Sequence, residues 1–218
     1  MVHFIKSLVP IFIFLSAQTG QAETLEQEAL DAVQSNYEKI LTFEAEFAQK
    51  SYVKMMDETQ HAKGTVSIKK PGRMNWIYGA PDTQVLISNG KTLWHYVADE
   101  EQVTKVPIES IYSSNTPALF LAGQGHLIQT FNIESVSLET NPICITLTPK
   151  KDDQALTRLQ LFANKKNYQI TGSTVYDKLG NKTEIRFSNI KTNLDIPEKT
   201  FQFQVPPYTE VLDYTKCP

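Results

Sequence analysis

Residues 64–97 constrain the fold more than any other part of the chain, because short β-type runs alternate there with turn formers. The runs are rich in the β-branched and aromatic residues that favour strands, and they lie at 65–69, 74–78, 83–88 and 92–97. Asn89-Gly90, between the last two runs, is a strong hairpin signal, since a type I′ turn needs positive φ at both central residues. The stretch therefore predicts an antiparallel meander.

Strand patterns continue through most of the chain. In residues 43–53, Phe43, Ala45 and Phe47 alternate with Glu44, Glu46 and Ala48, as in a half-buried strand. Residues 55–62 are interpreted as a polar connection, and 101–106 is expected to pair with 92–97. Further runs between turn signals lie at 130–138, 142–147, 157–163, 169–176, 183–190 and, as a short last strand, 200–205. This spacing predicts a mainly β (α+β) fold with one large curved antiparallel sheet or an open barrel.

Two segments interrupt the β pattern. Residues 24–41 have helical periodicity, with Thr24 and Gln27 at capping-box spacing, and predict an amphipathic helix that packs on the sheet over a solid core or a cavity. Residues 107–125 predict two short helical turns, 108–112 and 117–122. The second is apolar all round, so it must be buried on several sides. It forms either a lid over the open end of the barrel or a core-filling connection.

The N-terminus predicts a cleaved secretory signal over residues 1–22. Lys6 precedes an apolar run at 8–17, and Gly20-Gln21-Ala22 offers small residues for cleavage. The run is too short to span a bilayer, which takes about 20 apolar residues. No cysteine follows the cleavage site, so a lipid anchor is not expected. Residues 23–218 are then a single domain, soluble outside the cytoplasm.

Charge and motifs argue against other classes of protein. The formal net charge is −3, whereas a nucleic-acid-binding domain needs a basic excess or stripe, so no nucleic acid is expected. The four histidines are scattered, and the chain has no H-E-x-x-H, G-x-S-x-G or C-x-x-C motif. We therefore expect no catalytic site, metal or cofactor. His95 is expected on the outer face of its strand or in a satisfied core position.

Several motifs together resemble the periplasmic outer-membrane lipoprotein carrier family, LolA. They are KKPGRMNW at 69–76, SNGKTLWHY at 88–96, NTPALFLA at 115–122 and LTPK at 147–150, supported by FEAEFAQK at 43–50 and FQFQVPP at 201–207. They occur in the family's order and spacing and cover essentially all of the mature chain.

The resemblance implies an incomplete, strongly curved antiparallel barrel whose hydrophobic cavity is covered by helices. It implies a monomeric carrier in the periplasm of a Gram-negative bacterium. The carrier takes acylated lipoproteins from an inner-membrane ABC transporter, shields their acyl chains and delivers them to an outer-membrane receptor. The alternative is a module of the same fold that senses or carries another lipid or amphiphile.

The motif matches also imply site residues. The acyl-chain cavity is expected to be lined by Phe43, Phe47, Trp76 and Tyr78 from the strands and by Leu119, Phe120 and Leu121 from the lid. Family members typically carry an arginine at the position of Lys70, where it holds the lid closed. An ammonium lacks the planar fork of a guanidinium, so the latch is Lys70, or Arg73 in its place, or Lys70 is simply solvated.

The two cysteines depart from the family pattern. In an oxidising compartment Cys144 and Cys217 can pair and pin the C-terminal tail to the sheet. The alternative is a buried thiol at Cys144 and a loose thiol at Cys217.

Overall fold

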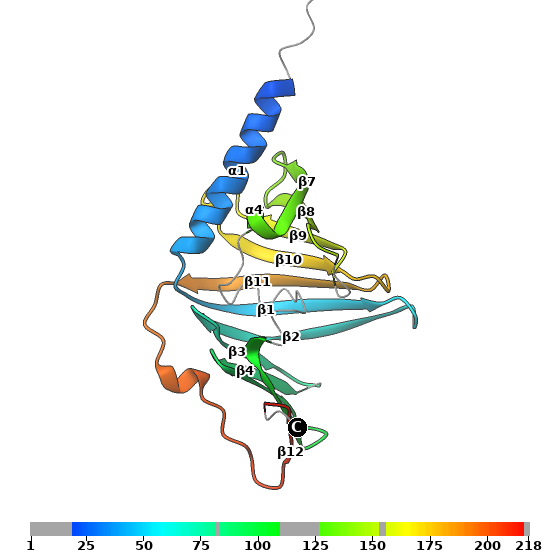
Figure 1. The fold of residues 1–218 in the computed structure, drawn as a ribbon, viewed down its shortest axis with the longest axis vertical. Coiled ribbons are helices and arrows are strands. Elements are labelled where there is room, and N and C mark those ends of the chain that lie inside the picture. Colours follow the sequence, from blue (N-terminus) through cyan, green and yellow to red (C-terminus); the bar gives the residue numbers. More distant parts are fainter. Residues whose placement is uncertain (1–18, 82, 110–126, 153–155, 216–218) are drawn as a thin grey trace, which may run out of the picture.

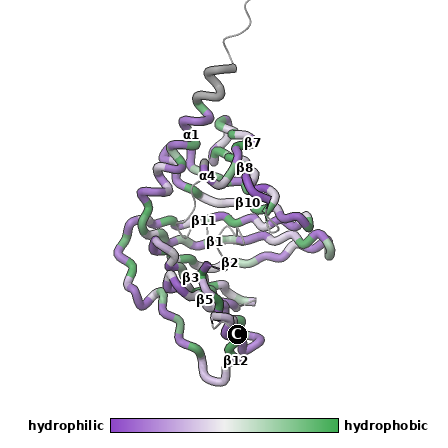
Figure 2. The backbone as a smooth tube through the Cα atoms, in the orientation of Figure 1, coloured by the Kyte–Doolittle hydropathy of each residue, from purple (hydrophilic) through white to green (hydrophobic). Residues whose placement is uncertain are grey.

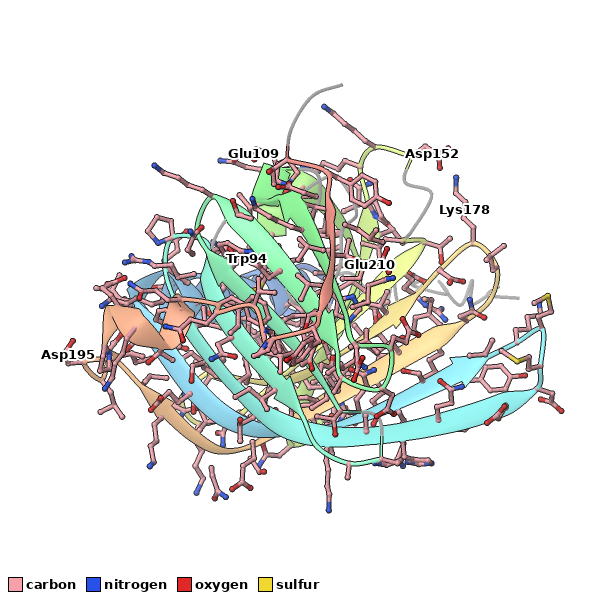
Figure 3. The ribbon with its side chains drawn as sticks, turned by 90° about the horizontal axis from the view of Figure 1, so that it is seen from below. Trp94, Glu109, Asp152, Lys178, Asp195 and Glu210 are labelled. Atoms are coloured by element: carbon pink, nitrogen blue, oxygen red, sulfur yellow. The ribbon has the colours of Figure 1, made fainter. Side chains whose placement is uncertain are left out.

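A single 12-stranded sheet dominates the computed structural model of the protein, which describes residues 19–81, 83–109, 127–152 and 156–215 (Figure 1). The strand order is β12-β6-β5-β4-β3-β2-β1-β11-β10-β9-β8-β7. The strands are β1 (Thr42–Val53), β2 (Glu58–Lys69), β3 (Arg73–Tyr78), β4 (Gln84–Asn89), β5 (Thr92–Val97), β6 (Gln102–Pro107), β7 (Phe131–Ser137), β8 (Ile143–Pro149), β9 (Arg158–Ala163), β10 (Ile170–Tyr176), β11 (Lys182–Thr192) and β12 (Glu210–Asp213). The sheet is strongly curved and does not close on itself, as predicted (Figure 3).

Strand β1 joins two meanders. It pairs antiparallel with β2 on one side and with β11 on the other. Each meander then continues by antiparallel neighbours, as far as β6 on one side and β7 on the other. Only the pairing of β12 with β6 is parallel among the described strands. The expected pairing of residues 101–106 with 92–97 is confirmed as β6 on β5.

Helix α1 (Thr19–Lys39) packs on one face of the sheet, here called the inner face (Figure 1). Hydrophobic and hydrophilic residues are interspersed along the helix and the strands, as in elements with one buried side (Figure 2). The side chains that α1 buries are Ala29, Leu30, Val33 and Tyr37, and they share one cluster with the inner-face residues of the strands. The predicted packing of this helix on the sheet is therefore confirmed.

The boundaries of two elements differ from the prediction. The helix begins at Thr19, so Thr24 lies inside it instead of capping it. Residues 58–62, expected as part of a polar connection, are the first part of β2. Most of their side chains are exposed. That end of the strand is therefore held by backbone pairing with β1 rather than by burial, and polar composition concealed it.

The predicted last strand at 200–205 is also wrong. The chain forms the short 3-10 helix η2 (Glu198–Phe201) and then runs extended to β12. Phe201 and Phe203 do alternate with polar residues, as in a strand, but their side chains pack on the outer face of the sheet while their backbone joins no strand. Phe201 is 1% exposed, and the Phe203 ring lies 6.4 Å from Trp94 and 6.0 Å from Tyr96 between centroids.

A second, smaller core therefore lies on the outer face, between β4–β6 and the C-terminal segment 193–209. It contains buried residues that do not belong to the main cluster, namely Ile87, Val103, Ile196 and Phe201. Asn75 in β3 donates a side-chain hydrogen bond of 2.9 Å to the Thr200 carbonyl oxygen. In the half of the sheet that contains β4–β6, side chains are therefore buried on both faces.

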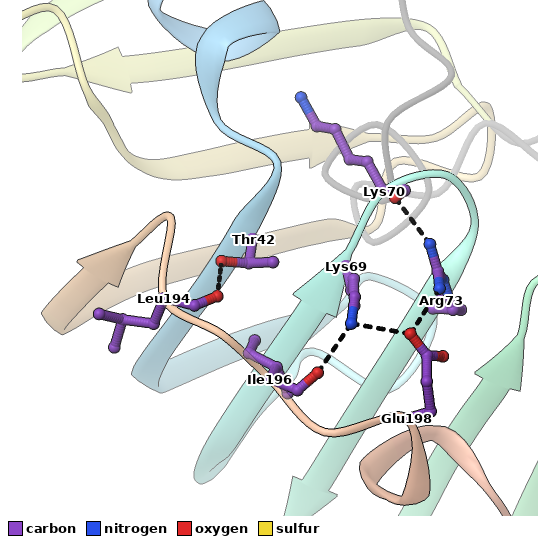
Figure 4. Close-up of polar contacts among 7 residues, drawn as sticks. All are labelled: Thr42, Lys69, Lys70, Arg73, Leu194, Ile196 and Glu198. Atoms are coloured by element: carbon purple, nitrogen blue, oxygen red, sulfur yellow. Dashed lines mark hydrogen bonds and ion pairs between the residues drawn. The ribbon is translucent and has the colours of Figure 1, made fainter.

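Polar contacts hold the start of the C-terminal segment (Figure 4). The Glu198 carboxylate forms ion pairs with Lys69 at 2.7 Å and with Arg73 at 2.9 Å. Lys69 also donates to the Ile196 carbonyl oxygen at 2.9 Å. These contacts fix the 3-10 helix against the β2–β3 hairpin.

Gly64 in β2 has no room for a side chain beside β3 and β1. An added Cβ would lie 1.9 Å from the Ile77 carbonyl oxygen and 2.9 Å from the Phe47 ring. Gly64→Ala is therefore expected to lower the free energy of unfolding by about 1–3 kcal/mol, measured by urea unfolding.

Gly79→Ala is the matched control, because its Cβ would approach only the Lys63 carbonyl oxygen, at 3.6 Å. Equal stability of the two variants would contradict the close packing at Gly64.

Candidate functional site

Aromatic side chains from three strands meet on the inner face. Phe47 in β1 lies edge-on to Trp76 and Tyr78 in β3, with ring centroids 5.0 and 4.9 Å apart. Phe187 in β11 contacts Trp76 at 6.2 Å and Phe43 at 5.3 Å. The structure thus brings together the four strand residues expected from the sequence.

Phe187 is the member of this cluster that sequence reasoning missed. It pairs directly with Phe47 across β1 and β11 and is 8% exposed. The strand at 183–190 was predicted, and its buried positions Ile185 and Phe187 alternate with exposed or half-buried ones. That alternation was the available signal, but it could not show that β11 lies beside β1.

Cross-strand rows define the lining of the inner face. One row runs through Ala45, Val66, Trp76 and Leu86, and the neighbouring row runs through Phe43, Ile68, Met74, Ser88 and Leu93. Nearly all of these side chains are buried. Apart from Ser88, the rows form an apolar floor, and pockets that bind hydrophobic ligands are lined mainly by such side chains.

A small pocket opens at the C-terminal end of α1. It is lined by Asn36, Tyr37, Ile40, Leu41, Thr42, Phe43, Ile68, Lys70 and Ile170. Its volume is about 20 Å³, which is room for about one water molecule. This pocket is therefore too small for a hydrocarbon chain.

Lys70 reaches this end of the helix. Its Nζ lies 3.5 Å from the centroid of the Tyr37 ring and donates a hydrogen bond to the Tyr37 carbonyl oxygen. That carbonyl belongs to the last turn of α1, where a cation is favourable. Burial lowers the pKa of Lys70 to about 8, against the opposing effect of Glu38. The side chain is thus partly buried rather than simply solvated.

Arg73 does not reach α1. It pairs with Glu198 and donates to the Lys70 carbonyl oxygen at 2.9 Å. Figure 4 shows the Lys70 side chain pointing away from this cluster. Of the two candidate latch residues, Lys70 alone touches the helix in the described part of the chain.

The structure describes only one of the remaining expected site residues, Cys144. Leu119, Phe120, Leu121 and Cys217 lie outside the described residues. Cys144 is a free, half-buried thiol on β8, and burial raises its pKa. The chain before Cys217 is held on β6, near the other edge of the sheet (Figure 1). That placement does not favour the disulfide, which stays a prediction.

His95 lies on the inner face, because it pairs with Leu86, the partner of Trp76. Of the two positions expected for His95, the outer face is wrong, since Trp94 and Tyr96 occupy that face and contact Phe203, and the structure is nearer to the alternative of a satisfied inner position. His95 is half-buried and lies 2.8 Å from Gln84 Oε1 through its Nε2. Burial lowers its pKa.

The described residues contain no group of three or more histidine, cysteine or acidic side chains that could hold a metal ion. Within the same part of the chain, no helix is long and apolar enough to cross a membrane.

Lys70→Met is expected to remove a pH dependence of stability. The pKa of Lys70 is about 8 in the folded protein against 10.5 ordinarily, so the unfolded chain binds more protons between these values. The contribution of Lys70 to stability therefore rises as the pH rises through this window and is constant below it. Urea unfolding at about pH 7 and about pH 9.5 measures the difference.

Lys166→Met serves as the control, because Lys166 is exposed in the turn between β9 and β10. It should keep the wild-type pH dependence. A Lys70→Met protein with that same dependence would contradict the burial of the amino group against α1.

Comparison with known proteins identifies relatives over nearly the full length. The chain is 33% identical over 202 residues to an outer-membrane lipoprotein carrier protein of Hahella chejuensis, covering 91% of this chain and 93% of the relative. It is 30% identical over 194 residues to the protein of the same name from Methylococcus capsulatus, covering 89% and 90%.

A solved structure and a family model also match. The crystal structure of an uncharacterized conserved protein from Thermus thermophilus has a TM-score of 0.53 at 14% identity, covering 86% of this chain and 98% of that one, so it shares the fold. The family model described as outer membrane lipoprotein carrier protein LolA matches residues 38–204. The chain therefore belongs to the LolA family of outer membrane lipoprotein carrier proteins.

Proposed function

We propose that this protein is a periplasmic carrier that shields the acyl chains of lipoproteins on the inner face of its sheet. The proposal rests on the cluster of aromatic side chains on the inner face, formed by Phe43, Phe47, Trp76 and Phe187. The chain that carries this cluster belongs to the lipoprotein carrier family. The floor is broad and apolar and continues across several strands. A carrier needs such a surface and no catalytic group.

The hydrophobic effect makes such a carrier necessary. Burial of a methylene is worth about 0.8 kcal/mol, so an anchor of roughly 45 acyl carbons exposed to water would cost on the order of 35 kcal/mol. Membrane-anchored lipoproteins therefore do not cross an aqueous compartment unescorted.

The pathway follows from the same role. The protein accepts acylated lipoproteins from an inner-membrane ABC transporter and passes them to an outer-membrane receptor, working as a monomer that docks transiently. Residues 1–22 are a signal that is cleaved on export to the periplasm of a Gram-negative bacterium, and 23–218 are the single carrier domain. The motif order in the chain supports this assignment.

A lid and a latch complete the proposed site. Leu119, Phe120 and Leu121 cover the inner face together with α1, and cargo displaces this cover. Lys70 holds the last turn of α1 in the covered form through its contacts with Tyr37. The release of this contact accompanies loading.

A release assay tests the function. The mature protein is incubated with inner-membrane vesicles that contain the transporter and ATP, and the soluble complexes are identified by mass spectrometry. Acylated lipoproteins at about one per protein are expected. A free lipid alone would support the other use of this fold, a sensor or carrier of another amphiphile, and no bound lipid would contradict both.

Phe120→Asp is expected to abolish cargo loading in this assay while the sheet stays folded by circular dichroism, because a charge in the lid opposes its contact with acyl chains. Ala48→Asp is the control, since Ala48 is exposed on β1 beside Phe47, and it should load normally. Normal loading by Phe120→Asp would remove residue 120 from the lid.

A further inference from the structure

The inner face changes from apolar to polar along its strands. The row nearest the end of α1 contains Phe43, Ile68, Met74, Ser88 and Leu93, and the next contains Val66, Trp76, Leu86 and His95. The row after that, toward the β1–β2 turn, joins Phe47 through Gly64 to Tyr78, which donates a hydrogen bond to Gln49 Oε1 at 3.1 Å. Trp76 therefore lies one row from the polar pair of Tyr78 and Gln49.

Trp76 carries a buried donor without an acceptor. The side chain is 2% exposed, and its indole Nε1 has no hydrogen-bond partner. Buried donors in folded proteins are nearly always paired, so an exception calls for an explanation. An unpaired N–H costs free energy that an incoming acceptor would recover.

The polar neighbours of Trp76 do not fill this role. Tyr78 and Gln49 pair with each other, and Gln49 also donates to Ser51 at 3.0 Å. His95 pairs with Gln84. Among the described polar groups of β1 and β3–β5 on this face, the indole N–H remains the open donor, whereas the unpaired hydroxyl of Ser173 lies on β10.

We propose that Trp76 Nε1 donates a hydrogen bond to a carbonyl oxygen at the head of a bound acyl chain. An acyl chain in an ester or amide ends in such a carbonyl, and the carbonyl divides the apolar tail from the polar head. Bound at Trp76, it places the tail over the rows of Phe43 and Met74 and the head toward Tyr78 and Gln49. The tryptophan thereby fixes how deeply the chain enters. This inference rests on the proposed carrier function.

The test compares two lipids that differ in the carbonyl alone. Dioctanoylglycerol, a diester, and 1,2-di-O-octylglycerol, its diether, are titrated against the mature protein carrying the apolar dye N-phenyl-1-naphthylamine, and displacement gives both affinities. The preference for the diester, as a ratio of affinities, is expected to fall about tenfold in Trp76→Phe, the effect of about one hydrogen bond.

Trp94→Phe is the matched control, because the chain's other tryptophan lies on the outer face against Phe203. It should keep the wild-type ratio. A wild-type protein that does not prefer the diester overturns the inference without any variant, as does an unchanged ratio in a folded Trp76→Phe. If neither lipid displaces the dye, the inference and the carrier function both fail, whereas equal displacement by both lipids overturns the inference alone.

Discussion

The structure depends on β1, because this strand joins the two halves of the sheet. Its pairing with β2 joins residues that are close in the sequence. Its pairing with β11 brings residues 43 and 192 together, and closing this long loop costs more conformational entropy. The same strand supplies Phe43 and Phe47 to the inner face. The interaction that assembles the sheet therefore also assembles the aromatic floor.

The two faces of the sheet are used differently. The outer face of β4–β6 is covered by the chain's own C-terminal segment through Phe201 and Phe203, and the clamp on Glu198 fixes where this segment begins. In this half of the sheet the outer face is thus covered by the chain itself. Under the proposed function, the inner face is the one that exchanges partners, and these outer contacts do not depend on that exchange.

Sequence patterns predicted the strands wherever one face of a strand is buried, as in β1, β3 and β5. They failed where backbone pairing alone makes the strand, as in the exposed start of β2. They also failed at Phe201 and Phe203, since alternation reports a buried side but not whether the backbone joins a ladder. Phe187 was missed for a related reason, because the neighbour of β11 is set by long-range pairing that no local pattern encodes.

The contact between Lys70 and Tyr37 indicates how firmly the cover is held. The lowered pKa of Lys70 means that the charged form is penalised by burial, so the lysine stabilises the helix less than a fully compensated cation would. The remaining hold on α1 comes from the burial of Leu30 and Val33 in the main hydrophobic cluster. Polar contacts add to it, since Asn36 donates to the Asn167 carbonyl oxygen at 3.2 Å and Gln34 Oε1 accepts from Leu127 N–H at 3.1 Å. In the proposed carrier, an acyl chain that displaces the Leu30 and Val33 side chains supplies apolar contacts in place of the ones they lose. Under that proposal the equilibrium between the covered and the loaded form shifts by the difference in affinity between the two arrangements.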